Sequence, residues 1–237
     1  MLRYLCFLAI ILGVRSALAP FIKPCKTGDR QCIIRSAQAA LPIVAPGIPE
    51  LNVPSMDPLR LDLVKGDTGS LKLTFKNTDV KGMKGCSVDN AKQDLVKGKA
   101  SVTIRCTVTL TGDYELGGQL ALLPVQGQGK YTIDIRDIII KAYTDQETVT
   151  GADGKPHWHI KDWRHTYQVK TSTVFHFDNL FGGNKALGEP IQQFLNSNWR
   201  DVMNEVAPPI VYAIVEGVVK GVEALYKAVP AEELYIP

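Results

Sequence analysis

The middle of the chain, from about residue 57 to residue 177, alternates apolar and polar positions with the two-residue period of a β-strand. Residues 71–76 and 102–110 alternate strictly, and residues 131–136 and 169–177 continue the pattern less regularly. This alternation predicts an antiparallel sheet with one apolar and one polar face. The expected turns between its strands lie at glycine-containing segments, at residues 66–69, 97–99, 117–118, 127–129 and 151–154.

After residue 183 the period changes to that of a helix, with one helix expected at about 185–206 and a second from Pro209 to about Ala228. The second helix carries one narrow polar stripe and is apolar over most of its circumference. A surface helix is usually apolar along one stripe only, so something must enclose this one. The sheet is the available partner, and the predicted fold is α+β: a highly curved antiparallel sheet around a long C-terminal helix, in one domain. The polar stripe consists of Glu216, Lys220, Glu223 and Lys227.

The segment before the sheet predicts a short helix followed by an irregular crossing. Residues 29–41 have apolar positions at helical spacing, and Asp29 can cap the first turn. Prolines at 42, 46, 49 and 54 then predict the absence of regular structure through residue 49, because each lacks a backbone donor and restricts its predecessor.

The first residues resemble a secretory leader. Arg3 precedes an apolar run that is shorter than the roughly 20 residues needed to span a bilayer, and small residues follow. We expect a signal peptide at residues 1–16, with an alternative end at residue 19, and a mature domain at 17–237. An uncleaved membrane anchor is the competing interpretation. The mature protein is therefore expected to be secreted and extracellular.

Composition excludes a general attraction to polyanions. The sequence has 27 Lys and Arg against 24 Asp and Glu, and Arg3 and Arg15 belong to the predicted leader, which leaves a net charge of about +1. We therefore expect no nucleic-acid partner. No second apolar run is long and charge-free enough to span a membrane, so no stable membrane insertion is expected. We also expect a monomer. The sequence has no Asn-x-Ser/Thr triplet, so N-glycosylation is not expected.

Four cysteines remain after the leader, and an even number in an oxidising compartment indicates disulfides. Four cysteines allow three pairings. Proximity favours Cys25 with Cys32, and Cys86 would face Cys106 if residues 95–98 form a hairpin turn. A zinc site is the alternative, although the CxxC spacing typical of such sites is absent.

No catalytic motif is evident. The chain lacks a Gly-x-Ser-x-Gly elbow, an HExxH motif and a phosphate-binding loop, so we expect no enzyme activity and no cofactor. His157 and His159 share one face of an extended segment, with Asp162 and His165 nearby, which is one arrangement that can hold zinc. The segment follows a Gly-Ala-Asp-Gly turn and has the alternating aromatics of an exposed hairpin, which favours a structural role over a metal site.

Several short motifs, in order along nearly the whole mature chain, resemble the takeout-like and juvenile hormone binding proteins of insects. Near the C-terminus these are Asp-Asn-Leu-Phe-Gly-Gly at 178–183, Phe-Leu-Asn-Ser-Asn-Trp-Arg at 194–200 and Val-Pro-Ala-Glu-Glu-Leu at 229–234. Each motif is weakly specific alone, but their order and spacing together are fairly specific. Upstream, the matching segments are residues 24–32, 47–49, 56–59, 75–77, 112–114 and 123–129.

The resemblance implies an elongated fold with an internal apolar tunnel for a lipophilic ligand, and a Cys25–Cys32 bridge. The juvenile hormone binders proper have a second bridge that uses cysteines in the C-terminal third. This chain has no cysteine after Cys106, so it is more similar to the takeout-like members. Members of the group have been linked to circadian output, feeding and chemosensation.

We therefore expect a secreted carrier of a small hydrophobic ligand of the terpenoid, quinone or fatty-acid type. The alternative is a membrane-lipid-binding or protein-interaction module that acts in circadian, feeding or chemosensory signalling. Gly217 and Gly221 would allow a strand or a ligand to approach the second helix closely. The same apolar residues could instead fill a solid core. The residues expected to line the cavity are Leu73, Phe75, Val102, Ile104, Val108, Tyr131, Ile133, Ile135, Phe175 and Phe177 on strands and Tyr212, Val215, Val219 and Val222 on the helix.

Overall fold

The computed structural model describes residues 18–236. The predicted signal peptide, residues 1–16, lies outside the described residues, and only Leu18 and Ala19 of the longer alternative are described. In chain order the elements are β1 (Cys25–Lys26), α1 (Arg30–Val44), η1 (Pro49–Leu51), β2 (Leu59–Lys65), β3 (Lys72–Lys81), η2 (Met83–Gly85), β4 (Ser87–Asp94), β5 (Lys99–Leu120), β6 (Leu123–Thr150), β7 (Pro156–Phe177), η3 (Phe181–Gly183), α2 (Lys185–Ser197), α3 (Trp199–Ala228), α4 (Ala231–Leu234) and β8 (Tyr235–Ile236).

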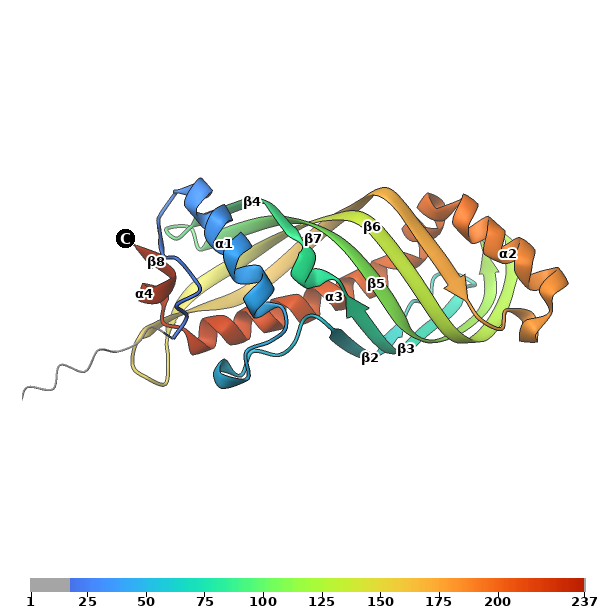
Figure 1. The fold of residues 1–237 in the computed structure, drawn as a ribbon, viewed down its shortest axis with the longest axis horizontal. Helices are drawn as coiled ribbons and strands as arrows, with labels where there is room; N and C mark the ends of the chain where they lie inside the picture. The colour runs from blue at the N-terminus through green and yellow to red at the C-terminus, as the bar shows by residue number, and fades with distance from the viewer. Residues whose placement is uncertain (1–17, 237) are drawn as a thin grey trace, which may run out of the picture.

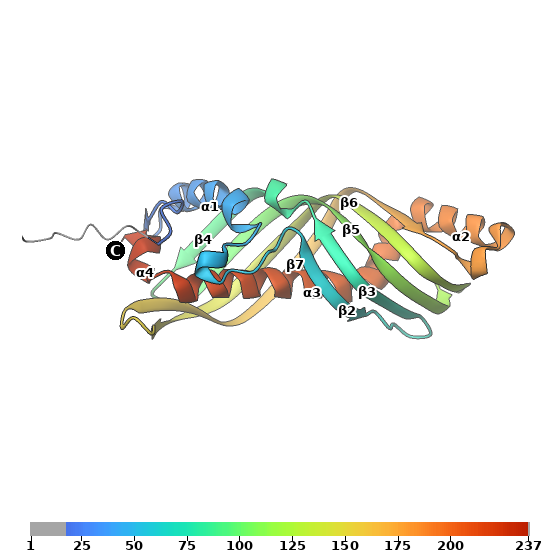
Figure 2. The ribbon, with the colours of Figure 1, turned by 60° about the horizontal axis from the view of Figure 1, so that its bottom comes forward.

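Six strands form one antiparallel sheet in the order β2-β3-β5-β6-β7, and β4 pairs with the first part of β5. The long strands curve around α3, which runs along the long axis of the molecule (Figures 1 and 2). The two edge strands, β2 and β7, both contact α3, so the helix closes the open side of the sheet. The predicted curved sheet around a long C-terminal helix is confirmed.

Strands β5 and β6 run through segments that the sequence predicts as turns. Residues 117–118 lie within β5 and residues 127–129 within β6, so both turn predictions are wrong. Their glycines make room for close neighbours: a Cβ at Gly118 would clash with the Ser70 carbonyl, and one at Gly127 would clash with the Tyr114 hydroxyl. The actual hairpin turn is Ala121 and Leu122, which both have positive φ.

The C-terminal helices divide at a different residue from the one predicted. The break is at Asn198, whose backbone and side-chain N–H groups both donate to the Phe194 carbonyl, and Pro208 and Pro209 lie inside α3. Proline in a helix removes one backbone hydrogen bond. Pro208 and Asn204 are both exposed, so water can bind the Asn204 carbonyl that Pro208 leaves free, and the helix continues.

Helix α1 also runs further than predicted. Asp29 caps it as expected, by accepting from the Cys32 N–H at 3.0 Å. The helix passes through Pro42 and ends at Val44, so the predicted irregular crossing begins later. Buried packing of Val44 and Ala45 holds this last turn, and the Ala45 carbonyl accepts from two following N–H groups.

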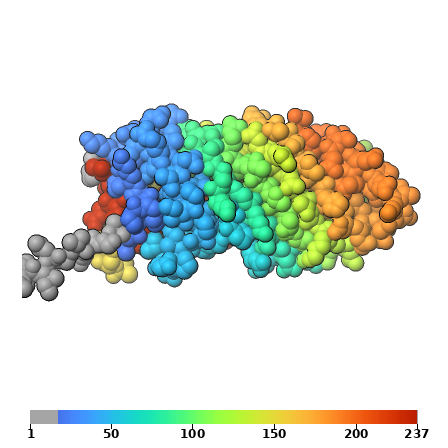
Figure 3. Space-filling model, viewed as in Figure 1, coloured from blue at the N-terminus to red at the C-terminus, as the bar shows by residue number. Residues whose placement is uncertain are grey.

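Both ends of the described chain meet at one end of the molecule, and α2 covers the other (Figures 1 and 3). Strand β1 pairs in parallel with β8, which places Cys25 opposite Tyr235. The Glu233 carboxylate accepts hydrogen bonds from the N–H groups of Leu18 and Ala19.

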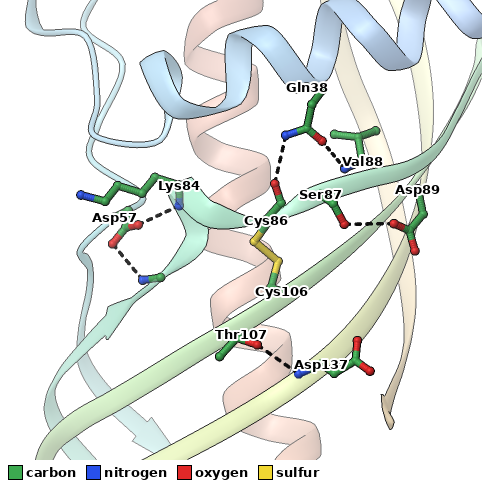
Figure 4. The surroundings of a disulfide bond; sticks show 11 residues. Gln38, Asp57, Lys84, Cys86, Ser87, Val88, Asp89, Cys106, Thr107 and Asp137 are labelled. Atoms are coloured by element: carbon green, nitrogen blue, oxygen red, sulfur yellow. Dashed lines mark hydrogen bonds between the residues drawn. A yellow bond between two sulfur atoms is a disulfide. The ribbon is translucent and has the colours of Figure 1, made fainter. Parts of the chain in front are cut away.

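Two disulfides join neighbouring elements. Cys25–Cys32 links β1 to the first turn of α1, and Cys86–Cys106 links the start of β4 to β5. The second bridge lies across the β4–β5 hairpin, in the arrangement expected from a turn near residues 95–98. Beside it, the Gln38 side chain of α1 binds the exposed edge of β4 through the Cys86 carbonyl and the Val88 N–H (Figure 4).

Candidate ligand-binding interior

The apolar interior consists of two separate cores. The larger one lies at the α2 end, where α2 and residues 202–215 of α3 pack against the inner face of the sheet. The smaller one lies at the end where the termini meet, and includes Ala40 and Val44 of α1, Trp158 of β7 and Leu225 of α3. The section between these cores, which we call the middle section, consists of half-buried residues, several of which pack against the larger core.

The middle section is defined by three rows of paired residues on β5, β6 and β7. On β5 and β6 the rows lie two, four and six residues from the buried pair Cys106–Ile138, so they share its inner face. On β7 the second row contains His165 and the third contains Trp163, whose rings lie 6.1 and 5.0 Å from the ring of Tyr212 at the seam with α3. All nine residues of the rows are half-buried although they face the enclosed helix. The rows are Ile104–Ile140–Tyr167, Val102–Ala142–His165 and Ala100–Thr144–Trp163.

Residues of helix α3 are also less buried between the two cores. Val218 and Val222 are half-buried, whereas Ile214 before them and Leu225 after them are buried. Apolar residues on both the sheet and the helix are therefore only half-buried between the two cores. A packed protein interior leaves few such surfaces.

A pocket of about 780 Å³ lies next to the middle section at the α1 end. Ala100, Thr144 and Trp163, which form the third row, belong to its lining. Most of the other lining residues are polar or charged, in contrast to the rows further inside. They are Gly28, Arg30, Ile33, Lys92, Gln93, Asp94, Lys99, Ser101, Tyr143, Asp145, Asp162 and Arg164.

Few polar groups face the middle section itself. Burial lowers the pKa of His165, which favours a neutral imidazole that can donate one hydrogen bond and accept another. Burial raises the pKa of Tyr167, so its hydroxyl keeps its proton. An apolar wall with a small number of such groups can hold a lipophilic molecule and orient one of its oxygen atoms.

The residues predicted to line a cavity divide into three groups. Tyr212 is 52% exposed and lies at the seam between α3 and β7, outside the interior. Val102, Ile104, Phe177, Val219 and Val222 are half-buried, and the first two belong to the middle section. The others are buried within the larger core: Leu73, Phe75, Val108, Tyr131, Ile133, Ile135, Phe175 and Val215.

Several residues of the middle section were missed, for two reasons. Residues 138–140 are three consecutive isoleucines, and a register shift beside Asp137, which has a φ of 61°, hides the alternation of β6. On β7, by contrast, Trp163, His165 and Tyr167 alternate clearly, but this signal was interpreted as an exposed hairpin.

The histidine-rich start of β7 is not an exposed hairpin, because His157 and Trp158 are buried. The His157 ring binds the Tyr226 carbonyl at 2.9 Å and the Asp153 carboxylate at 3.1 Å, whereas His159 binds Glu223 at 2.7 Å. The two imidazoles thus have different partners, and residues 18–236 contain no cluster of three metal-binding side chains. These contacts fix β7 to the end of α3.

The two glycines of α3 face residues that come from, or directly precede, β2. A Cβ at Gly217 would lie 2.8 Å from a Leu59 methyl group, and one at Gly221 would lie 2.5 Å from the Met56 sulfur. In this structure the glycines therefore serve close packing of the helix against the edge of the sheet.

The model of the haemolymph juvenile hormone binding protein family matches residues 4–236. The chain belongs to this family. The resemblance drawn from the sequence motifs is thus confirmed.

Three members or relatives of the juvenile hormone binding protein family show how far the similarity extends. Takeout 1 of Epiphyas postvittana, known from a crystal structure, has a TM-score of 0.88 and 32% identity, over 91% of this chain and 100% of that one. The circadian clock-controlled protein daywake of Drosophila melanogaster is 27% identical over 90% of this chain and 86% of its own. The juvenile hormone-binding protein of Manduca sexta is 26% identical over 52% of this chain and 60% of its own.

Proposed function

We propose that the protein is a secreted carrier of a small lipophilic molecule, of the terpenoid, quinone or fatty-acid type, bound between the sheet and α3. The observation that carries this proposal is the half-buried apolar surface of the middle section, which lies between two fully packed cores. A ligand there would remove this surface from water, at about 25 cal/mol per Å² of apolar area.

The family supports binding rather than catalysis. The Manduca sexta relative is named for binding juvenile hormone, which is the kind of ligand that an apolar interior accepts. His165 and the Tyr167 hydroxyl, which belong to the middle section, are suited to positioning a ligand oxygen. We therefore propose no enzyme activity.

The disulfides support secretion, and the contacts of Leu18 and Ala19 bear on where the leader ends. Two disulfides fit an oxidising compartment. Ala19 is only 2% exposed, and its N–H and that of Leu18 bind Glu233. Cleavage after residue 19 would remove these contacts, so we favour a leader of residues 1–16 and a mature domain of residues 17–237.

We propose that the carrier is monomeric and does not insert stably into membranes. Helix α3 is long and apolar enough to span a bilayer by length and composition. However, both edge strands contact it, and Glu216, Lys220 and Lys227 interrupt its outer face. Exposing the inner face to lipid would require the sheet to open.

Native mass spectrometry of the secreted protein, followed by organic extraction, tests the carrier function. We expect one lipophilic molecule per chain, released on denaturation. Ala142→Phe should fill the middle section and lower occupancy about tenfold. Lys141→Phe is the matched control, because the neighbouring Lys141 is exposed on the outer face and its variant should keep the ligand. Equal occupancy in both variants, or uptake of no terpenoid, quinone or fatty acid by the delipidated wild type, would overturn the proposal.

A further inference from the structure

The hairpin that joins β5 to β6 has an uncharged tip. Residues 116–129 contain no Asp, Glu, Lys, Arg or His, although Glu115 and Lys130 lie directly on either side of them. Among the described residues, 118–125 form strand pairs only with each other, because β3 pairs with β5 only as far as Gly117 and β7 pairs with β6 only from Tyr131 onward. The tip therefore projects beyond the neighbouring strands, at the end of the molecule that α2 covers (Figures 1 and 2).

The turn at this tip holds an apolar side chain in an unfavourable backbone conformation. Ala121 and Leu122 have φ values of 46° and 69°, which residues with a side chain adopt only at a cost in free energy, and Leu122 is 87% exposed. Two-residue hairpin turns with positive φ usually contain Asn, Asp or Gly. Neither the turn geometry nor packing within the chain accounts for a leucine at this position. Strained backbone of this kind is typical of functional segments.

The base of the hairpin, by contrast, is firmly packed. Leu120 and Val125, just before and after the turn region, are 2% and 3% exposed and belong to the larger core. Gly118 lies so close to the Ser70 carbonyl that a Cβ there would clash with it. Leu122 is therefore held outward on a fixed support and does not belong to a long, unsupported loop.

We propose that this tip is a docking point for the surface of a zwitterionic phospholipid membrane, into which Leu122 inserts reversibly. The inference goes beyond ligand binding and does not depend on it. An uncharged hairpin enters an apolar medium without the large cost of dehydrating a charge. The pairs between residues 118–120 and 123–125 already bind most of its backbone polar groups, as a medium without water requires. Burial of one leucine strengthens partitioning by about tenfold or more, which gives a shallow and reversible attachment.

The shape of the tip favours a lipid surface over a protein partner. A two-residue turn presents far less than the roughly 800 Å² that each partner contributes to a stable protein interface. A fluid lipid surface, by contrast, needs no matching pocket. Val96 in the turn at the other end of β5 is 95% exposed, but Asp94, Lys97 and Lys99 surround it in sequence. Inserting that turn would take these charges out of water, so the two exposed turns are not equivalent.

Flotation of the mature protein with phosphatidylcholine vesicles tests the docking point. We expect the wild type to bind the vesicles at about 1 M salt as well as at about 0.1 M, because no charge contributes. Leu122→Asn should lower the partition coefficient at least about tenfold. This variant should also raise the unfolding temperature, because asparagine adopts positive φ more readily than leucine, so its weaker binding would not reflect misfolding. Leu122→Trp should strengthen binding, since tryptophan favours the membrane interface.

Val96→Asn is the matched control, because it makes a similar change of polarity at the exposed turn at the other end of β5. It should leave vesicle binding unchanged. A wild type that binds no vesicles, or an equal loss of binding in the two asparagine variants, would overturn the docking point and leave the proposed carrier function intact. A dimer that forms without vesicles and is lost in Leu122→Asn would assign the tip to a second copy of the chain and would also overturn the lipid surface as its partner.

Discussion

The larger core and the middle section are built from the same sheet and the same helix, yet one is filled and the other is accessible. Both carry alternating apolar residues on β5, β6 and β7. They differ in the arrangement of these residues: the core has interlocking rings from four strands, whereas the middle section has Ala100 opposite Thr144 and Ala142 between Val102 and His165. Alternation thus determines which face is apolar, and side-chain volume determines whether that face encloses space.

The largest expected difference between the two regions is in how much the free energy of unfolding falls when an inward-facing aromatic side chain is replaced by alanine. Phe175 and Tyr167 lie on the same strand and face the same interior, but Phe175 is buried and Tyr167 is half-buried. Phe175→Ala should lower the free energy of unfolding by about 3–5 kcal/mol, and Tyr167→Ala by less than about half of that, because little packing is lost. Urea denaturation measures both values.

The two variants serve as controls for each other, since both replace a ring on β7 by a methyl group. Equal losses would mean that the middle section is as densely packed as the core. A saturating lipophile should narrow the gap between the two losses, because it stabilises the wild type and Phe175→Ala equally but stabilises Tyr167→Ala, which loses a residue of the middle section, less.

The two disulfides should differ less. Cys86–Cys106 spans 20 residues and borders the larger core, whereas Cys25–Cys32 spans 7 residues at the end where the termini meet. Loop-closure entropy predicts that replacing both cysteines by alanine lowers the free energy of unfolding by about 3 kcal/mol for Cys86–Cys106 and by about 2 kcal/mol for Cys25–Cys32. Denaturant titration of both variants tests the ranking. A larger loss for the Cys25–Cys32 variant would show that the terminal end depends on its bridge more than loop length implies.

The sequence was sufficient to predict the architecture because the decisive signals are periodic. Strict alternation at 71–76 and 102–110, and a helix apolar over most of its circumference, require a sheet that wraps a helix. Local signals were less reliable. Gly118 and Gly127 resemble turn residues, but they lie within strands because a neighbouring carbonyl and a tyrosine ring need the space.

The position of the ligand site was beyond the reach of the sequence pattern. Phe175 and Tyr167 occupy equivalent inward positions on β7, so periodicity alone does not distinguish a residue of a packed core from one that lines a cavity. Only the three-dimensional arrangement shows that Phe175 is buried 6.4 Å from the Phe177 ring, whereas Tyr167 belongs to a half-buried row. Similarly, Tyr212 is of a residue type that can line a cavity, but its position around the circumference of α3 places it at the exposed seam with β7.

The smallest expected effect concerns pH and should distinguish the two regions most cleanly. Burial lowers the pKa of His165 in the folded state below the value of about 6.5 in an unfolded chain. The unfolded state therefore binds more protons as the pH falls, so the stabilising contribution of neutral His165 is complete above about pH 6.5 and is lost below it. The larger core should contribute nothing in this range, because Tyr114 and Tyr131 have pKa values of about 12. His165→Phe should reduce the loss of stability between about pH 7.5 and about pH 5, measured by urea denaturation, and Tyr167→Phe, which keeps the imidazole, should leave it unchanged. An unaltered pH profile in His165→Phe would mean that the imidazole is solvated in the folded protein, and the middle section would then be open to water at the level of its second row.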